Sequence, residues 1–484
     1  MLSFAAFLVG VDSIATHLSA PGQKNVSPGN FKLESCKVAG VTGEAKCGVY
    51  QVFENRTAAK GRKIGLKILV IPATGSKPLP DPFVYISGGP GTSAIEAARG
   101  IAAEFADLRE ERDLLFVDQR GAGESHPLNC DFYNPDDLQS YLGHFFPLED
   151  VRKCRQQLEQ KADLTLYTTP IAMDDLEEVR AALGYKQLNL FGGSYGTRAA
   201  LVFLRRHPQS VRTITLHGVA PTNQHMPLAF AQHNERALQG IINECAADEA
   251  CKKAFPNLGT ETRNVLERLK NEPVEVEVRN PRPGKVRLSR DLAAEAIRYM
   301  LYAPGPASQV PFFLYRAAQG DFVPLAEAAL RYRRELVGTG SNGMYLSITC
   351  AEDLPWIKPG EGEQMAANTF LGDYRYQQQR AACELWPRAK IPADYFEPTS
   401  SPVPALILSG EWDPVTPPSN GELAARYLLN SLHVVVPHGA HGFGGLEGIE
   451  CVNRIHVEFV KGGSATGLNT SCVKNIRRRG FRVK

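Results

Sequence analysis

One short segment constrains the fold of this chain more than any other: an apolar stretch at residues 187–191 runs directly into Gly-Gly-Ser-Tyr-Gly at 192–196. A helical pattern follows from about Arg198 to Arg206. A strand, a Gly-x-Ser-x-Gly turn and a helix are together the context of a nucleophile elbow, which holds its serine at the carboxyl edge of a sheet. The glycines leave room for the neighbouring chain and for a substrate carbonyl. We therefore predict that Ser194 is a catalytic nucleophile; the alternative is a structural glycine-rich turn.

A serine hydroxyl is a poor nucleophile alone, so an acid and a base must lie elsewhere in the chain. The acid is expected after residues 404–410, which have the pattern of a buried strand and lead into a loop that carries Glu411 and Asp413. Asp413 is favoured because it lies further past the strand, directly before Pro414, which fixes the direction of the turn. The alternative is that Asp413 only caps this turn.

The base is expected after the next strand pattern, at residues 432–436. Of the eleven histidines, His438 and His441 follow this strand directly. His441 is favoured because small residues flank it on a loop that can reach the serine; the alternative is a surface histidine. The resulting order of serine, acid and histidine along the chain is typical of α/β-hydrolases.

A serine hydrolase also needs backbone N–H donors for the oxyanion that develops during acyl transfer. The residue after the nucleophile, Tyr195, is expected to supply one of them. The second is expected from the loop Gly-Gly-Pro-Gly at 88–91, which follows a strand pattern at 83–87. We predict the N–H of Gly89 as this donor; taken alone, the loop is equally well an ordinary turn.

Three motifs together resemble one family of serine peptidases. They are the loop at 88–91, Asp-Gln-Arg-Gly-Ala-Gly-Glu-Ser at 118–125 and the elbow at 192–196. The chain resembles the proline iminopeptidase family, and within it the secreted tripeptidyl aminopeptidase-like branch, over roughly residues 30–475. Ser87 departs from the family, in which a histidine usually precedes the two glycines. The resemblance implies an α/β-hydrolase fold with an inserted helical cap, and a reaction that needs no metal and no organic cofactor.

The order of predicted elements agrees with that fold. Strand patterns alternate with helical ones between about residues 65 and 218, which predicts a mainly parallel sheet flanked by helices. Strands resume only at residue 404, and the intervening stretch has helix-like runs, such as 261–269 and 292–301. The predicted organisation is a cleavable leader at 1–20, the first part of the core at 30–221, a helical cap at 222–400 and the second part of the core at 401–484.

The ten cysteines lie in close sequential pairs. Sequence alone does not fix their connectivity. Local pairing is the simplest option, and the secreted relatives resemble it; metal binding and reduced thiols are the alternatives, although no Cys-x-x-Cys is present. An even number of locally paired cysteines favours an oxidising compartment, and hence a secreted or periplasmic protein. The expected disulfides are Cys36–Cys47, Cys130–Cys154, Cys245–Cys251, Cys350–Cys383 and Cys451–Cys472.

Charge and hydropathy exclude several classes of partner. The net charge is +2 without long runs of one sign, which argues against a nucleic-acid partner. No apolar stretch has the length of a membrane span, so stable membrane insertion is not expected. The sequence does not determine the oligomeric state, although a monomer is favoured. Residues 2–10 are apolar and Ser19-Ala20 fits the end of a leader, but a basic start is missing. The alternative is an N-terminal segment that is disordered or packs on the core.

A peptidase that acts from the N-terminus must recognise a free α-ammonium, and buried carboxylates serve that purpose. The resemblance implies glutamates of the cap. Glu352 and Asp353 are the best candidates, since a disulfide at Cys350 would hold them rigidly. The alternative is that they cap a helix or face solvent.

These observations predict a secreted serine exopeptidase that releases residues or short peptides, such as di- and tripeptides, from free N-termini. Its partners are therefore peptide substrates with a free amine. One alternative is a secreted esterase or lipase-type hydrolase with the same triad. A second alternative is a non-catalytic binding protein on a hydrolase scaffold.

Overall fold

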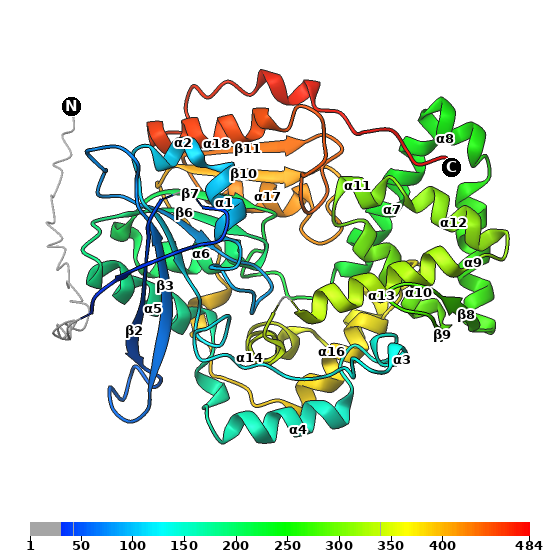
Figure 1. The fold of residues 1–484 in the computed structure, drawn as a ribbon, viewed down its shortest axis with the longest axis horizontal. Coiled ribbons are helices and arrows are strands. Elements are labelled where there is room, and N and C mark those ends of the chain that lie inside the picture. The colour runs from blue at the N-terminus through cyan, green and yellow to red at the C-terminus, as the bar shows by residue number, and fades with distance from the viewer. Residues whose placement is uncertain (1–30, 42, 339) are drawn as a thin grey trace, which may run out of the picture.

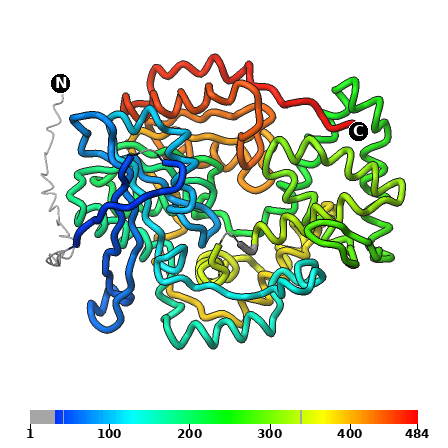
Figure 2. Tube along the Cα trace, in the orientation of Figure 1, coloured from blue at the N-terminus to red at the C-terminus, as the bar shows by residue number. Residues whose placement is uncertain are grey.

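The computed structural model describes residues 31–41, 43–338 and 340–484 (Figure 1). The leader predicted at 1–20 lies outside the described residues. A central sheet with helices on both faces forms one part of the molecule, and a mostly helical cap lies beside it (Figure 1). The chain passes from the sheet into the cap and returns, and the C-terminal segment then crosses from the sheet to the cap (Figure 2).

The sheet has nine strands in the order β1-β2-β3-β5-β4-β6-β7-β10-β11. The strands from β5 to β11 in this order pair in parallel, whereas β1, β2 and β3 join the sheet antiparallel at one edge. The predicted mainly parallel α/β-hydrolase sheet is thus confirmed. The strands are β1 (Glu34–Cys36), β2 (Ala45–Phe53), β3 (Lys63–Ile71), β4 (Phe83–Ile86), β5 (Leu114–Val117), β6 (Leu188–Gly193), β7 (Val211–His217), β10 (Ala405–Gly410) and β11 (Ser431–Val436).

Strand β10 shows why the sheet lies between two layers of helices. All six of its residues are buried, as expected of a parallel strand covered on both faces. Because side chains alternate along a strand, Ala405 and Ile407 pack with α5 (Thr169–Ala182) and α6 (Tyr195–Arg206). Leu406 and Leu408 pack on the other face with α1 (Ala98–Glu104), α2 (Ala106–Arg109) and α18 (Glu450–Gly462). Each such buried aliphatic side chain contributes roughly 1.5–3 kcal/mol to folding.

The cap lies between β7 and β10 in the chain, and it is not wholly helical. A hairpin of β8 (Val274–Val278) and β9 (Gly284–Leu288) lies within it, so the expectation that strands resume only at residue 404 is wrong. The valines of this hairpin pack into the cap's own core. The cap helices are α7 (Phe230–Ala247), α8 (Glu249–Ala254), α9 (Leu258–Asn271), α10 (Arg290–Met300), α11 (Pro304–Ala307), α12 (Val310–Ala318), α13 (Val323–Gly338), α14 (Asn342–Glu352), α15 (Glu361–Ala366) and α16 (Tyr374–Leu385).

One segment of the first chain half also lies against the cap. Helices α3 (Leu138–Tyr141) and α4 (Leu148–Glu159) follow β5, within the stretch predicted as core. Helix α4 contacts α14 and α16, and α3 contacts α13 and β9. Helix α17 (Pro418–Ala425) instead packs on β10 and β11 in the second part of the core. The excursion that carries α3 and α4 therefore ties the sheet to the cap.

The structure joins the ten cysteines in the five sequential pairs expected, and each pair closes a local loop. Closing a loop lowers the entropy of the unfolded chain, which stabilises the fold. The pair at Cys350 fastens α14 to α16 inside the molecule. Within the described residues, no helix has both the length and the apolar character needed to cross a membrane. The disulfides are Cys36–Cys47, Cys130–Cys154, Cys245–Cys251, Cys350–Cys383 and Cys451–Cys472.

Candidate active site

Ser194 lies at a strained turn between β6 and α6. Its φ of 56° and ψ of −125° are rare for a residue with a side chain, and such strain is concentrated at functional sites. The turn is tight because a β-carbon at Gly192 would lie 2.4 Å from the carbonyl oxygen of Gly196. A β-carbon at Gly196 would lie 2.0 Å from the carbonyl oxygen of Ile86. Both glycines are therefore required for the elbow.

Four parallel strands end at the same edge of the sheet, and this edge collects the predicted catalytic residues. Ser194 follows β6, Asp413 follows β10 and His441 follows β11. His217, the last residue of β7, accepts a hydrogen bond from the N–H of Ser194 on its carbonyl oxygen at 2.9 Å. Parallel pairing of these strands thus brings side chains together that are up to 247 residues apart, from Ser194 to His441.

Asp413 and His441 form a buried pair. The Nδ1 of His441 lies 2.9 Å from Oδ2 of Asp413, whose side chain is wholly buried. Asp413 also accepts hydrogen bonds from the N–H groups of Val415 and Thr416 and from the hydroxyl of Thr416, each at 2.8 Å. Since the carboxylate of Asp413 can only accept, the pair favours the imidazole tautomer that carries its proton on Nδ1 and donates it to Asp413. Nε2 of His441 is then unprotonated and can act as a base.

Charge and hydrogen bonding reinforce this pair. Burial alone raises the pKa of Asp413, but the charge of His441 and the donated hydrogen bonds outweigh it and hold the pKa well below its usual range. Burial likewise lowers the pKa of His441, and the charge and hydrogen bond of Asp413 outweigh it, so the pKa is raised. The pair therefore holds an ionised acid beside a histidine with enhanced basicity.

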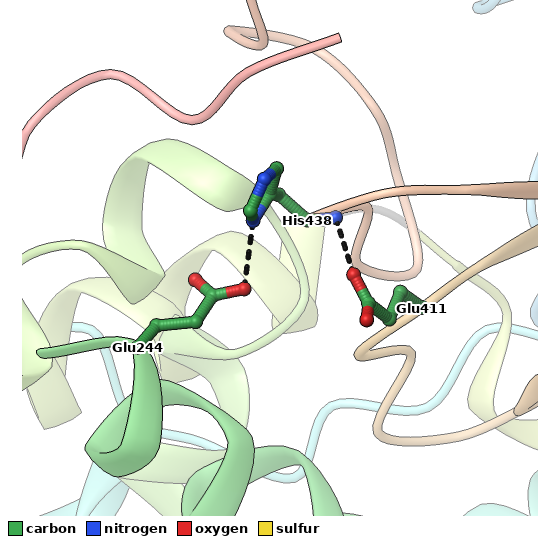
Figure 3. A group of neighbouring side chains, drawn as sticks. All are labelled: Glu244, Glu411 and His438. Atoms are coloured by element: carbon green, nitrogen blue, oxygen red, sulfur yellow. Dashed lines mark hydrogen bonds and ion pairs between the residues drawn. The ribbon is translucent and has the colours of Figure 1, made fainter. Parts of the chain in front are cut away.

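The rival acid and histidine of the same loops lie together elsewhere. Glu411 accepts a hydrogen bond from the backbone N–H of His438 at 2.9 Å, and Nδ1 of His438 lies 2.7 Å from Glu244 on α7 (Figure 3). Neither Glu411 nor His438 lines the two cavities that border Ser194. The structure thus brings together Asp413 and His441 with Ser194.

Glu244, Glu411 and His438 also form the cluster of potential metal ligands in the described part of the chain. Both carboxylate oxygens of Glu244 are occupied by protein donors, however. Glu244 accepts hydrogen bonds from Nε1 of Trp412 at 2.6 Å and from Nε of Arg478 at 2.7 Å. A cation here would have to displace the guanidinium of Arg478. We interpret the cluster as an ion-pair junction that joins α7, the loop after β11 and the C-terminal segment.

Two cavities border Ser194 and His441. The larger cavity, of about 560 Å³, lies between α1 and α18, and the cap cavity, of about 290 Å³, lies under α10, α14 and α16. Both volumes are in or near the range of small-molecule sites. Besides Ser194 and His441, the larger cavity is lined by residues that include Tyr85, Glu104, Phe191, His217 and His456. The cap cavity is lined by residues that include Phe145, Phe230, Arg298, Tyr302, Tyr345 and Arg375.

The predicted oxyanion loop lies against the nucleophile. A β-carbon at Gly88 would lie 3.1 Å from Cβ of Ser194, which is closer than most β-carbons come to another atom, so glycine eases this approach. Gly89 has a φ of 102° and lines the cap cavity beside Ser194. Tyr195 is the first residue of α6, where N–H groups point out of the helix end. Gly89 and Tyr195 thus lie next to Ser194, and their role as oxyanion donors stays a prediction.

Glu352 lies behind the elbow, in neither of the two cavities that border Ser194. It is wholly buried and accepts hydrogen bonds from the N–H of Thr169 at 2.6 Å, the hydroxyl of Thr169 at 2.7 Å and the hydroxyl of Tyr395. The hydroxyl of Tyr195 lies 2.8 Å from that of Thr169. Burial raises the pKa of Glu352 to about 7, against the opposing effect of these donors.

Asp353 is also wholly buried and outside both cavities. Its Oδ1 accepts hydrogen bonds from Nη1 of Arg198 and the N–H of Met226, both at 2.9 Å, while its Oδ2 has no hydrogen-bond partner. Burial raises its pKa despite the nearby Arg198. For either carboxylate to meet a substrate ammonium, this network would have to open. Their role as ammonium ligands stays a prediction.

Sequence reasoning missed several residues that line the cavities. Arg298 and Tyr302 come from α10 and the residues after it, Arg375 comes from α16, and Glu104 comes from α1. The ring of Tyr302 packs edge-on against His441, with centroids 5.3 Å apart. The sequence carried no signal for these roles beyond a helical pattern at residues 292–301.

An elbow serine, a buried acid–histidine pair and a mainly parallel sheet define a serine hydrolase of α/β architecture. The sequence matches the alpha/beta hydrolase fold family over residues 81–444, and the chain belongs to that family.

Three similar proteins are peptidases by name. The chain is 27% identical to the serine protease Hip1 of Mycobacterium tuberculosis, over 89% of this chain and 88% of that protein. It is 25% identical to the tripeptidyl aminopeptidase of Streptomyces coelicolor, over 87% and 81% of the two chains. A shorter match, 30% identical, covers 28% of this chain and 32% of the proline iminopeptidase of Xylella fastidiosa. The resemblance to this group of peptidases is confirmed, and the chain is a serine hydrolase.

Proposed function

We propose that this protein is a serine exopeptidase that removes single residues or short peptides, such as di- and tripeptides, from free N-termini. The observation that carries the proposal is the placement of Ser194 and the His441–Asp413 pair at one sheet edge, between two cavities. The names of the tripeptidyl aminopeptidase and proline iminopeptidase relatives support the class of substrate.

The chemistry follows from the geometry in two stages. Oγ of Ser194 attacks the scissile carbonyl carbon while its proton passes to Nε2 of His441, and Asp413 stabilises the imidazolium that forms. The N–H groups of Gly89 and Tyr195 bind the resulting oxyanion. His441 then gives its proton to the leaving amine, which leaves an acyl group on Ser194. In the second stage water, deprotonated by His441, attacks this ester and releases the N-terminal fragment.

The substrate ammonium needs a carboxylate, and the chain offers two kinds of candidate. Glu352 and Asp353 are the candidates from sequence, and both are enclosed by protein donors. Glu104 is exposed and lines the larger cavity together with Ser194. Among the described residues that line either cavity, it is the one with a carboxylate. We add Glu104 as an ammonium ligand to be tested beside the buried pair.

Matched fluorogenic tripeptide amides, free or acetylated at the N-terminus, test the proposal. We expect the free amine to be favoured at least about tenfold in kcat/KM, since a hydrogen bond to a charged group contributes about 1.5–3 kcal/mol. Glu104→Gln and Glu352→Gln each change one candidate carboxylate to an amide. The ammonium ligand is the residue whose substitution removes the preference for the free amine. Equal cleavage of both peptides, or hydrolysis of simple esters alone, would favour the esterase. Failure to react with a fluorophosphonate would favour the non-catalytic binding protein.

We also propose that the protein acts outside the cytoplasm, in the extracellular space or the periplasm. Five disulfides fit an oxidising compartment, because reducing conditions in the cytosol keep most thiols free. Fractionation of the native host, with detection of the oxidised protein, tests this location.

A further inference from the structure

The cap cavity presents positive charge to the nucleophile. Arg298 from α10 and Arg375 from α16 line it together with Ser194 and His441. The two arginines are only 2% and 6% exposed. Among the described residues that line this cavity there is no aspartate or glutamate.

Arg375 has hydrogen-bonding capacity that the protein leaves unused. Its Nη2 donates to the hydroxyl of Tyr345 at 2.8 Å, and the guanidinium centre lies 3.6 Å from the centroid of the Phe145 ring. Its Nε and Nη1 are buried without a hydrogen-bond partner. Buried donors without a partner are costly and are rare in native proteins, so each calls for an explanation.

The charges around the cavity do not balance. Arg298 and Arg375 line the cavity, and buried Arg333 lies over the ring of Phe145, which also lines it. Two buried carboxylates lie near this lining: Glu295, and Asp413, which is paired with His441. Arg298 donates from Nε to Glu295 at 2.9 Å, whereas Arg333 donates to backbone carbonyl oxygens of Tyr141 and His144. The next acid of α10, Asp291, is partly exposed and pairs with Arg290. A buried charge without a counter-ion is strongly unfavourable.

We propose that the cap cavity is a subsite for a carboxylate of the substrate, bound by Arg375 with Arg298 beside it. This assignment rests on the proposed hydrolysis of peptides at Ser194, and it names the chemical class of substrate. A carboxylate supplies both the acceptor atoms and the negative charge that the cavity lacks. Two sources have this chemistry: the C-terminal carboxylate of a short peptide, and an acidic side chain near the scissile bond.

The same charges determine which part of a peptide avoids the cavity. An α-ammonium in the cap cavity would lie next to two buried guanidinium groups and would be repelled by them. No carboxylate among the described lining residues offsets this repulsion. The larger cavity, which Glu104 lines, is the better place for the ammonium. The substrate would then lie with its amino end in the larger cavity and a carboxylate under the cap.

Two matched pairs of peptides with free N-termini separate the sources. The first pair is tetra-alanine with a free C-terminus and the same peptide as its C-terminal amide. The second pair is two tripeptide coumarin amides that differ by glutamate or glutamine in the middle position. We expect wild-type protein to favour the anionic member of at least one pair by about tenfold or more in kcat/KM. The first pair reports the C-terminal carboxylate and the second reports the side chain.

Variants then connect the preference to the cavity. In Arg375→Gln we expect the ratio of kcat/KM for the anionic substrate to kcat/KM for the neutral substrate to fall towards one. In Arg375→Lys we expect a ratio between those of Arg375→Gln and the wild-type protein. Arg268→Gln is the matched control, because Arg268 is exposed on α9 and lines neither cavity at Ser194. Should Arg375→Gln fail to fold, the substrate ratios of wild-type protein still decide. The proposed subsite is overturned if the protein cleaves peptides without any preference for a carboxylate. It is also overturned if Arg375→Gln leaves such a preference intact.

A further pair of substrates separates this proposal from the proposed function. If no peptide is cleaved, the exopeptidase proposal fails, and p-nitrophenyl butyrate is compared with the mono-p-nitrophenyl ester of glutaric acid. A tenfold preference for the glutarate, lost in Arg375→Gln, supports the carboxylate subsite in a hydrolase of another class. Equal rates on the two esters overturn it.

Discussion

Replacing Asp413 by asparagine tests the acid–histidine pair with minimal change of shape. Oδ1 of Asp413 accepts two backbone N–H groups, from Val415 and Thr416. These donors will hold the amide oxygen of the asparagine in the same place. The amide nitrogen then takes the position of Oδ2, facing Nδ1 of His441, which was 2.9 Å away. Because this nitrogen is a donor, His441 must become the acceptor at Nδ1 and carry its proton on Nε2.

That tautomer cannot take the proton of Ser194. In a serine protease with a corresponding acid, this kind of substitution lowers kcat about 10⁴-fold, and we expect a similar loss here. A loss of this size corresponds to about 5 kcal/mol of transition-state stabilisation. The fold should persist, since the backbone hydrogen bonds to the side chain are kept and its volume is nearly unchanged.

The pH profile gives a second reading of the same change. If His441 is the general base, as we propose, activity requires its neutral form, and the acidic limb of kcat/KM follows its pKa, which Asp413 raises. In Asp413→Asn the negative charge that raises the pKa of His441 is lost, while burial still disfavours the charged ring. The acidic limb of the kcat/KM profile therefore moves to lower pH. The assay is kcat/KM for an activated ester between pH 5 and 9, with stopped-flow measurement of fluorophosphonate labelling.

The matched control is Glu411→Gln, two residues earlier in the same loop. Glu411 contacts the backbone of His438 and borders neither cavity at Ser194, so we expect activity within about threefold of wild type. An Asp413→Asn variant that retains more than about a tenth of wild-type activity would exclude Asp413 as the partner of His441 in catalysis. So would a Glu411→Gln variant that loses as much activity as Asp413→Asn.

Two further predictions concern the surroundings of the elbow. Gly196→Ala places a β-carbon 2.0 Å from the Ile86 carbonyl oxygen and should lower the free energy of unfolding in urea by about 3 kcal/mol; Gly305→Ala, whose β-carbon meets nothing within 4 Å, should change it by less than about 0.5 kcal/mol. A stable, active Gly196→Ala would show that the elbow has another geometry. Glu352 has a folded pKa of about 7, above its ordinary 4.5, so it binds a proton more tightly in the folded chain and stability falls as pH rises between these values. Glu352→Gln should remove roughly 2 kcal/mol of that fall between urea unfolding at pH 5 and at pH 7, and an unchanged pH dependence would contradict it.

Local patterns in the sequence were sufficient for the elbow and the sheet. A buried strand followed by closely spaced glycines is compatible with few structures other than a nucleophile elbow. Parallel pairing of the strands then determines which loops lie at the same edge of the sheet. This is why Asp413 and His441 could be chosen from a single sequence. The hairpin of β8 and β9 was missed although Val-Glu-Val-Glu-Val at 274–278 alternates as a strand does, because the surrounding stretch reads as helical.

The cavities could not be predicted in the same way. Arg298 and Arg375 are 77 residues apart on two cap helices, and their meeting depends on how these helices pack. The burial of Glu352 likewise depends on Thr169 and Tyr395, which approach from distant segments. Spacing along a chain carries information about one helix or strand, whereas such cavities are made by contacts among several.

We propose Ser194 as the nucleophile, activated by His441 and Asp413. The most direct measurement is to label the oxidised protein with a fluorophosphonate, digest it and locate the adduct by mass spectrometry. We expect one adduct, on Ser194, which is absent from Ser194→Ala and forms far more slowly in Asp413→Asn. An adduct on another residue, or labelling of Ser194→Ala at the wild-type rate, would contradict it.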